Sequence, residues 1–303
     1  MKVLVATEKP FAAEAVNGIK KEIESAGHTL VVLEKYSEQQ LHEAIADADA
    51  LIVRSDKVTP ALLDLAKQLK IVVRAGAGYD NVDTAYAKEK GVVVENTPGQ
   101  NSNAVAELVF GLLVYAVRNF YNGKSGTELR GKKLGILAYG NVGRNVARIA
   151  KGFEMDVYAY DAFCPKEAIE KTGVHAVDNQ EALFEQCDIV SLHIPATPET
   201  LQSINYALVS KMKKNGILVN TARKEVINEP ELLKLMAERT DLKFVTDIKP
   251  DADAEFAAFE GRYFSTPKKM GAQTAEANTN AGIAAAKQIN AFFADGCTKF
   301  RVN

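Results

Sequence analysis

The chain has 303 residues, of which 47% are hydrophobic and 25% charged, and its formal net charge is −2. This length favours two domains, and the charge argues against bulk attraction to nucleic acid or to an anionic membrane. The three cysteines are far apart and form no CxxC pair, so we expect neither a disulfide framework nor a metal site. The N-terminal apolar run is too short for a signal peptide, and no run approaches the roughly 20 apolar residues of a membrane span, so we expect a cytoplasmic protein without membrane contact.

Short apolar runs alternate with helical patterns along the first third of the chain. The runs contain Val, Ile and Leu without polar alternation, which is typical of strands buried on both faces of a parallel sheet. Amphipathic segments such as 12–26 and 60–69 separate them, which indicates βαβ units. The predicted strands cover residues 3–6, 30–33, 50–53, 71–73 and 92–94.

A long and mostly apolar helix is predicted over residues 103–120, with Asn101 or Ser102 as its N-cap. We expect so apolar a helix to pack against the other domain or against a second subunit. Six further strands follow, at residues 134–138, 157–160, 189–194, 217–220, 244–246 and 263–265. Their number and type match a doubly wound dinucleotide-binding sheet.

The last predicted helix, at about 275–293, can cross back to the first domain, which would then be discontinuous. The predicted fold class is therefore α/β, with two doubly wound parallel-sheet domains. The predicted boundaries are 1–98, completed by about 277–303, and 99–276.

The turn after residues 134–138 carries the signature of a dinucleotide site. It contains Gly140, which allows a pyrophosphate to approach the backbone, and Gly143, which allows the next helix to pack closely on the strand. Ala138 holds the place of the first glycine, so the pattern is AxGxxG. Asp161 ends the next strand, near the spacing of about 20 residues at which an acid bonds the ribose hydroxyls and repels the 2′-phosphate of NADP. A plain strand–turn–helix is the alternative, but the combination favours NAD bound by Tyr139, Gly140, Asn141, Val142, Gly143 and Asp161.

Several segments together resemble the D-2-hydroxyacid dehydrogenase family, and within it most closely the D-3-phosphoglycerate dehydrogenases. They are residues 53–55, 73–83, 101–108, 191–200, 220–223 and 271–274, which span essentially the whole chain. The resemblance implies a flavodoxin-like substrate domain, a Rossmann NAD-binding domain and a homodimer. It also implies the NAD-dependent oxidation of 3-phosphoglycerate in serine biosynthesis. Because the chain ends soon after the last predicted helix, we expect no added regulatory domain.

The same resemblance implies roles for individual residues. Arg223 would bind the substrate carboxylate and the reacting oxygen, and the backbone N–H groups of Ala77 and Gly78 would hold the carboxylate. For a substrate phosphate, Arg54, Ser55 and Arg74 are the candidates, with Lys57 less favoured. Asn101 belongs to a further substrate-side motif. The implied cofactor contacts are His193, Ile194, Pro195, Thr221 and Asp247, of which Asp247 resembles the residue that contacts the nicotinamide amide.

The chain departs from the family at the general base, where a histidine is expected. When the segments are aligned at Gly271, Lys269 takes that place and Lys268 becomes an inserted residue. The family's partner glutamate falls on Ala252, and the two losses agree, because a carboxylate would raise the pKa of a lysine. A lysine base needs its pKa lowered by roughly 2–3 units from about 10.4. We predict Lys269 as the acid/base residue, with Lys268 as the other candidate and Asp251 or Asp253 as possible shifted carboxylates.

Two other functions stay open from the sequence. One is a glyoxylate/hydroxypyruvate or D-lactate type of reductase, for which we expect an apolar pocket in place of basic groups near Arg54. The other is a dinucleotide-sensing protein without catalysis, since the histidine is missing. A surface role for Lys269 would favour that second alternative.

Overall fold

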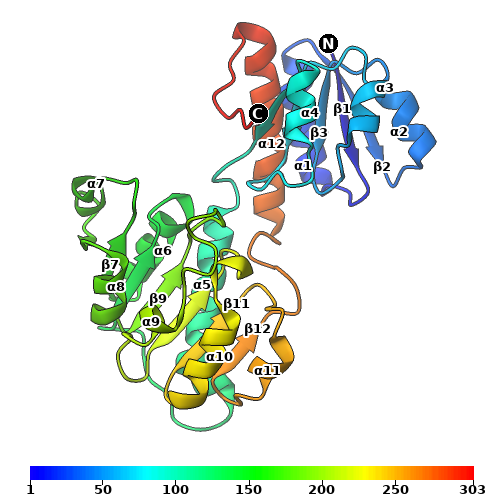
Figure 1. Ribbon diagram of the computed structural model, residues 1–303. Coiled ribbons are helices and arrows are strands. Elements are labelled where there is room, and N and C mark those ends of the chain that lie inside the picture. Colours follow the sequence, from blue (N-terminus) through cyan, green and yellow to red (C-terminus); the bar gives the residue numbers. More distant parts are fainter. The chain divides into compact units, whose positions relative to one another are not determined.

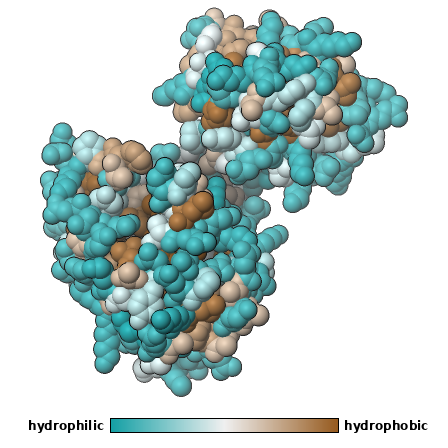
Figure 2. Space-filling model, viewed as in Figure 1, coloured by the Kyte–Doolittle hydropathy of each residue, from teal (hydrophilic) through white to brown (hydrophobic).

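A computed structural model describes residues 1–303 as two compact units. The first unit contains Met1–Asn101 and Gln273–Asn303, and the second contains Ser102–Ala272 (Figure 1). On the face shown in Figure 2, both units are mainly hydrophilic with scattered hydrophobic residues. No helix combines the length and the apolar character that crossing a bilayer requires.

The first unit is built on a five-stranded parallel sheet in the order β2-β1-β3-β4-β5, which is the flavodoxin-like order. Its strands are β1 (Lys2–Thr7), β2 (Thr29–Glu34), β3 (Ala50–Val53), β4 (Ile71–Arg74) and β5 (Val93–Asn96). Helices α1 (Ala13–Ser25) and α12 (Ala275–Asp295) cover one face. Helices α2 (Glu38–Ile45), α3 (Pro60–Leu65) and α4 (Thr84–Glu89) cover the other.

The lack of polar alternation in β1 follows from burial on both faces. Val3 and Val5 pack in the cluster under α1 and α12, whereas Leu4 and Ala6 pack in the opposite cluster. Helices α1 and α12 also approach each other closely, because a Cβ at Gly18 would lie 2.6 Å from Ile283 Cδ1. The last helix is therefore an integral layer of the first unit.

The second unit contains a seven-stranded, all-parallel sheet in the order β12-β11-β10-β9-β6-β7-β8. Its strands are β6 (Lys133–Leu137), β7 (Asp156–Tyr160), β8 (His175–Ala176), β9 (Ile189–Leu192), β10 (Ile217–Asn220), β11 (Lys243–Thr246) and β12 (Tyr263–Ser265). The strand order reverses between β6 and β9, which is the switch point where such sheets bind ligands. The two-residue β8 was not predicted, because so short a strand has no recognisable pattern.

Helices cover both faces of this second sheet. On one face lie α5 (Ser102–Val117), α6 (Asn141–Gly152) and α7 (Lys166–Glu170). On the other lie α8 (Gln180–Gln186), α9 (Tyr206–Val209), α10 (Glu229–Glu238) and α11 (Asp253–Ala257). Two 3-10 helices, η1 (Asn119–Tyr121) and η2 (Lys224–Val226), complete the unit.

Helix α5 differs from the sequence prediction in where it ends. It ends at Val117 because Asn119, Phe120 and Tyr121 have left-handed φ values of 52°, 54° and 56°. Its apolar residues were expected to face the other domain or a second subunit. They pack against α6 and the sheet of their own unit, and the expected contact with the other domain or a second subunit stays a prediction.

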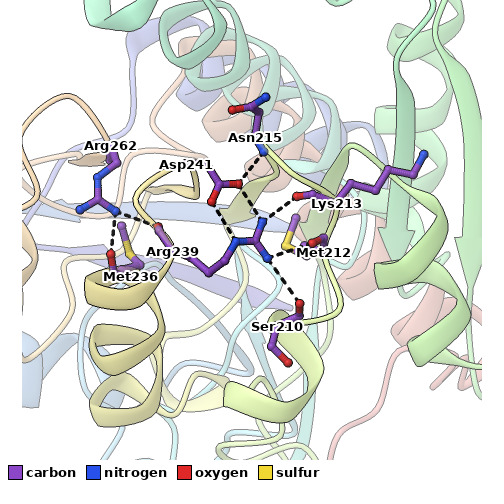
Figure 3. A network of polar contacts seen from close by, with 8 residues as sticks. All are labelled: Ser210, Met212, Lys213, Asn215, Met236, Arg239, Asp241 and Arg262. Carbon is purple, nitrogen blue, oxygen red and sulfur yellow. Dashed lines mark hydrogen bonds and ion pairs between the residues drawn. The ribbon is translucent and has the colours of Figure 1, made fainter.

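A polar network fixes the loops at the N-terminal ends of β10 and β11 (Figure 3). Arg239 Nε and Nη2 donate to the two carboxylate oxygens of Asp241 at 2.9 and 2.8 Å, and this ion pair lowers the pKa of Asp241. Asn215 N donates to Asp241 Oδ2 at 2.6 Å, and Arg239 Nη2 donates to Lys213 O at 2.9 Å. Ligands of such sheets bind at the carboxyl ends of the strands, whereas this network lies at their amino ends. We therefore assign the network to stabilisation of the fold.

Candidate active site

The turn between β6 and α6 has the backbone that a dinucleotide site requires. Ala138 follows β6 with a φ of 79°, a left-handed conformation that favours glycine, and its N–H donates to Tyr160 O at 2.9 Å. The alanine that replaces the first glycine of the motif therefore keeps the glycine conformation. The turn is preserved at a cost in strain of about 1–2 kcal/mol.

The two glycines of this turn have different surroundings. A Cβ at Gly143 would lie 2.3 Å from Ala138 O and 3.0 Å from Ile136 Cγ2, so only glycine lets α6 pack this closely on β6. A Cβ at Gly140 would meet no atom within 4 Å. Gly140 therefore leaves room for a group outside the chain, whereas Gly143 serves internal packing.

The first turn of α6 has no side-chain cap, and Gly140 is its N-cap residue. By contrast, α8 and α10 are capped by Asn179 and Asn228. The first N–H groups of a helix have no partners within the helix, and the helix dipole adds positive charge at this end. Together with the open space at Gly140, this end of α6 fits a pyrophosphate.

The carboxylate of Asp161 is held rigidly at the end of β7. Its Oδ2 accepts from Tyr139 N at 2.7 Å, and its Oδ1 accepts from Phe163 N and Cys164 N at 2.8 Å each. A carboxylate offers about four acceptor positions, so capacity remains for a hydroxyl donor. The Phe163 side chain beside it is 95% exposed.

His193 directly follows β9, on the neighbouring strand at the switch point. The ring Nε2 of His193 lies 2.9 Å from Ser191 Oγ, and its backbone N–H donates to Leu137 O at 2.9 Å. Burial lowers the pKa of His193 to about 3, so the ring is neutral at neutral pH. Ile194 and Pro195 follow in the loop, where Pro195 O accepts from Thr200 Oγ1 at 2.6 Å.

The loop after β10 is clamped by Asn220. Asn220 Nδ2 donates to Arg223 O at 2.9 Å, and Asn220 Oδ1 accepts from Ala222 N at 3.0 Å. Within this loop, the Thr221 side chain is 5% exposed and its buried Oγ1 has no hydrogen-bond partner in the structure. A buried hydroxyl without a partner is unfavourable, so Thr221 fits contact with a bound polar group.

The two predicted catalytic residues meet at one backbone carbonyl. Arg223 Nη1 donates to Ala222 O at 2.9 Å, and Lys269 Nζ donates to the same oxygen at 3.3 Å. The structure therefore brings Arg223 and Lys269 together, although 45 residues separate them in the sequence. Lys269 and Lys268, the other candidate base, are both exposed, and the backbone O of Lys268 accepts from Thr266 Oγ1 at 2.8 Å.

Asp247 holds the loop that carries Lys269. Its buried carboxylate accepts from Met270 N and Gly271 N at 2.7 Å each and from Thr266 Oγ1 at 3.1 Å. A Cβ at Gly271 would lie 2.8 Å from Asp247 Oδ2, which explains the glycine. Burial raises the pKa of Asp247, while these hydrogen bonds and the charge of Lys269 oppose the rise. This positioning role was not predicted, because it depends on contacts between two separate strand ends.

The candidate carboxylates near Ala252 have basic partners of their own. Asp251 forms an ion pair with Lys224, and Asp253 forms one with Lys249 at 2.8 Å. The structure adds a carboxylate that the sequence reasoning missed. Glu229, in the first turn of α10, accepts from Ala252 N at 2.8 Å through Oε2 and from Asp251 N at 3.1 Å through Oε1.

In the first unit, the predicted phosphate ligands lie at the carboxyl ends of β3 and β4. Arg54 donates to Lys9 O at 2.8 Å, to Pro10 O at 2.9 Å and to Asn278 Oδ1 at 2.7 Å. Much of the hydrogen-bonding capacity of Arg54 is thus used inside the chain. Ser55 is exposed, and Arg74 Nε donates to Arg54 O at 2.9 Å.

The loop of residues 76–78 is shaped by the neighbouring arginine. Gly76 has a φ of 153°, and a Cβ there would lie 1.4 Å from Arg74 Nη1, so the guanidinium lies directly against Gly76. Ala77 O accepts from Asn96 Nδ2 at 2.6 Å, and Gly76 O accepts from Thr97 N at 2.9 Å. These bonds orient Ala77 and the half-buried Gly78, and Asn101, also half-buried, is the last residue of this segment in the unit.

Comparison with known proteins agrees with this geometry. Residues 115–260 match the family model described as D-isomer specific 2-hydroxyacid dehydrogenase, NAD binding domain. The chain is 38% identical to the D-3-phosphoglycerate dehydrogenase of Methanocaldococcus jannaschii over 84% of this chain and 51% of the relative. It is 37% identical to the hydroxypyruvate reductase of Thermotoga maritima over 86% of this chain and 89% of the relative.

Among solved structures, the chain is similar to the NAD+-bound 3-phosphoglycerate dehydrogenase of Entamoeba histolytica. The two share 46% identity and a TM-score of 0.87, over 100% of this chain and 98% of that one. The chain spans about half the length of the curated phosphoglycerate dehydrogenases that it matches, with 51% of the Methanocaldococcus protein covered.

Proposed function

The chain belongs to the family of D-isomer-specific 2-hydroxyacid dehydrogenases and carries that family's NAD-binding domain, and on this premise we propose that it is a D-3-phosphoglycerate dehydrogenase. The reaction oxidises 3-phosphoglycerate to 3-phosphohydroxypyruvate, a step of serine biosynthesis. The observation that carries the proposal is the convergence of Arg223 and Lys269 on Ala222 O. A permanent cation and a candidate proton acceptor thus lie within hydrogen-bond distance of the same oxygen, Ala222 O.

The two cations have different tasks in this proposal. Arg223 binds the hydroxyl oxygen at C2 and stabilises the negative charge that develops on it. Lys269, as the neutral amine, accepts the hydroxyl proton. Bound NAD supplies the acceptor for the hydride from C2.

Cofactor binding is assigned to the carboxyl ends of β6, β7, β9 and β10. The first turn of α6, opened by Gly140, receives the pyrophosphate, and Asp161 receives the ribose hydroxyls and disfavours NADP. Thr221 and His193 would contact the nicotinamide half, since they follow the strands on the other side of the switch point. Asp247 acts as a positioning residue for Lys269 through the amides of the 270–271 segment.

For the first unit we propose a separate contribution, the binding of anionic groups of the substrate. The backbone of Ala77 and Gly78 suits a carboxylate, and Ser55 and Arg74 suit a phosphate. The hydrogen bonds from Asn96 and Thr97 keep the 76–78 backbone in one conformation. Arg54 contributes mainly through its hydrogen bonds to Lys9 O, Pro10 O and Asn278 Oδ1, which stabilise this end of the sheet.

Steady-state oxidation of NADH with three substrates tests the proposal. We expect phosphohydroxypyruvate to have a kcat/KM at least tenfold above that of hydroxypyruvate or glyoxylate. A preference for hydroxypyruvate would favour the second candidate, a hydroxypyruvate reductase, whose Thermotoga relative is matched over 89% of its length. Bound NADH without turnover of any substrate would favour a dinucleotide-sensing protein.

The finer statements on assembly and location are also proposals. We expect a homodimer, as the family resemblance implies, and a cytoplasmic location, as expected from the N-terminal sequence. Light scattering on the purified chain would show a mass of about twice 32.9 kDa. A mass of 32.9 kDa at micromolar concentration would contradict the dimer.

A further inference from the structure

The first unit contains a pocket on the α12 side of β5, and none of residues 76–78 lines it. We call it the α12 pocket, and its volume is about 260 Å³. Residues from β5, from the segment after it, from α12 and from the C-terminal tail line it. The ones that matter here are Glu95, Pro98, Ala284, Gln288, Ala291 and Phe300.

Two buried acceptors lie in this pocket. Glu95 is 1% exposed, and its Oε1 accepts from Phe300 N at 3.2 Å. Gln288 is 9% exposed, and its Nε2 donates to Asn96 O at 3.1 Å. The other amide atom, Gln288 Oε1, is buried and has no hydrogen-bond partner in the structure. The pocket therefore presents acceptors that call for a donor.

The remaining surroundings favour a cationic donor with an apolar tail. Burial raises the pKa of the Glu95 carboxyl, so a positive group beside it would offset the loss of hydration. Lys287 at the rim is 62% exposed and its Nζ forms an ion pair with Glu22 Oε1 at 3.8 Å. Ala284, Ala291 and Phe300 supply apolar surface for a short alkyl chain.

We propose that the α12 pocket binds a small primary alkylammonium, whose N–H groups donate to Glu95 and to Gln288 Oε1. Gln288 also holds Asn96, and Asn96 Nδ2 holds Ala77 O at 2.6 Å. Ligand binding that orders Gln288 is therefore transmitted through Asn96 to the 76–78 loop. The α12 pocket is therefore an effector site that Asn96 connects to the 76–78 loop, and the proposed function uses this loop.

Calorimetric titration of the full chain with n-propylammonium chloride tests the site without relying on activity. We expect saturable binding, and at least tenfold weaker binding of n-propanol and of tetramethylammonium at equal ionic strength, because neither combines charge with N–H donors. Glu95→Gln keeps the shape of the side chain and should weaken binding at least tenfold. Glu89→Gln, an exposed change of the same charge on α4, should have no effect.

Ala284→Leu provides a second variant that fills the pocket and leaves both acceptors in place. It should abolish binding, and it carries the test if Glu95→Gln does not fold. Hydrogen exchange of the peptide covering residues 75–97 should slow on ligand addition. Absence of saturable binding, or undiminished binding in Ala284→Leu, would overturn the site. Binding without any change in exchange would overturn the coupling to the 76–78 loop.

Discussion

Replacing Gly143 by alanine tests whether the β6–α6 turn is built as described. The new Cβ would lie 2.3 Å from Ala138 O, about 1 Å inside normal van der Waals contact. The obstacle is backbone, so α6 must move away from β6. Overpacking of this kind costs about 1–3 kcal/mol, and we expect the upper end of that range. For a unit of this size, each kcal/mol lowers the melting temperature by roughly 2–4 °C, so we expect a loss of roughly 6–12 °C.

Gly140→Ala is the matched control, since it adds the same methyl group three residues earlier. No atom lies within 4 Å of the new Cβ, and Gly140 has a φ of −79°, which alanine adopts readily. Stability should change by less than about 1 kcal/mol. The methyl group, however, enters the space that we assign to the pyrophosphate. We expect NADH affinity to fall at least tenfold, or about 1.4 kcal/mol.

Thermal unfolding and fluorescence titration with NADH distinguish the two roles. Gly143→Ala should lose stability even without a nucleotide, and Gly140→Ala should lose affinity at nearly unchanged stability. A Gly143→Ala variant as stable as the wild type would refute the packing argument. A Gly140→Ala variant with wild-type affinity would place the pyrophosphate elsewhere.

Three further changes test other parts of the second unit. Ala138→Gly should raise stability by about 0.5–1 kcal/mol in urea unfolding, because release of left-handed strain exceeds the added chain entropy; a loss of stability would contradict the strain. Lys269→Met should lower turnover about 10²–10⁴-fold with unchanged NADH affinity, while Lys268→Met stays near the wild type; near-normal turnover of Lys269→Met would exclude it as the base. His193 has a lowered pKa of about 3, so its contribution is present above pH 6.5 and is lost as the pH falls below that value. Between pH 7 and pH 5 the wild type should therefore lose about 2 kcal/mol more stability than His193→Asn, and equal losses would contradict the burial of this ring.

The turn at the start of α6 was accessible from the sequence because its signals are local. The strand, the two glycines and Asp161 follow in order, and each acts on its near neighbours. The substituted first position was harder to interpret, since an alanine in the sequence does not indicate a left-handed backbone conformation. Only the backbone shows that Ala138 has a φ of 79° and keeps the turn.

The surroundings of the proposed base were less accessible. Alignment of the 271–274 segment pointed to Lys269, but it left Asp251 and Asp253 open as partners. In the structure, Asp251 pairs with Lys224 and Asp253 pairs with Lys249. The loop that carries Lys269 is held instead by Asp247, which accepts from Met270 N. Side chains at the ends of different strands have no fixed spacing in the sequence, so their pairing was not predictable.

The sequence by itself determined the fold class of both units, because a parallel strand that is buried on both faces requires an uninterrupted apolar run. It also determined the dinucleotide turn, whose parts lie within one βαβ unit. Only the tertiary structure decided that Arg223 and Lys269 share Ala222 O, and that Glu95 and Gln288 face one pocket. These pairs join residues far apart in the chain, and their contact depends on strand order and loop path, which local patterns do not encode.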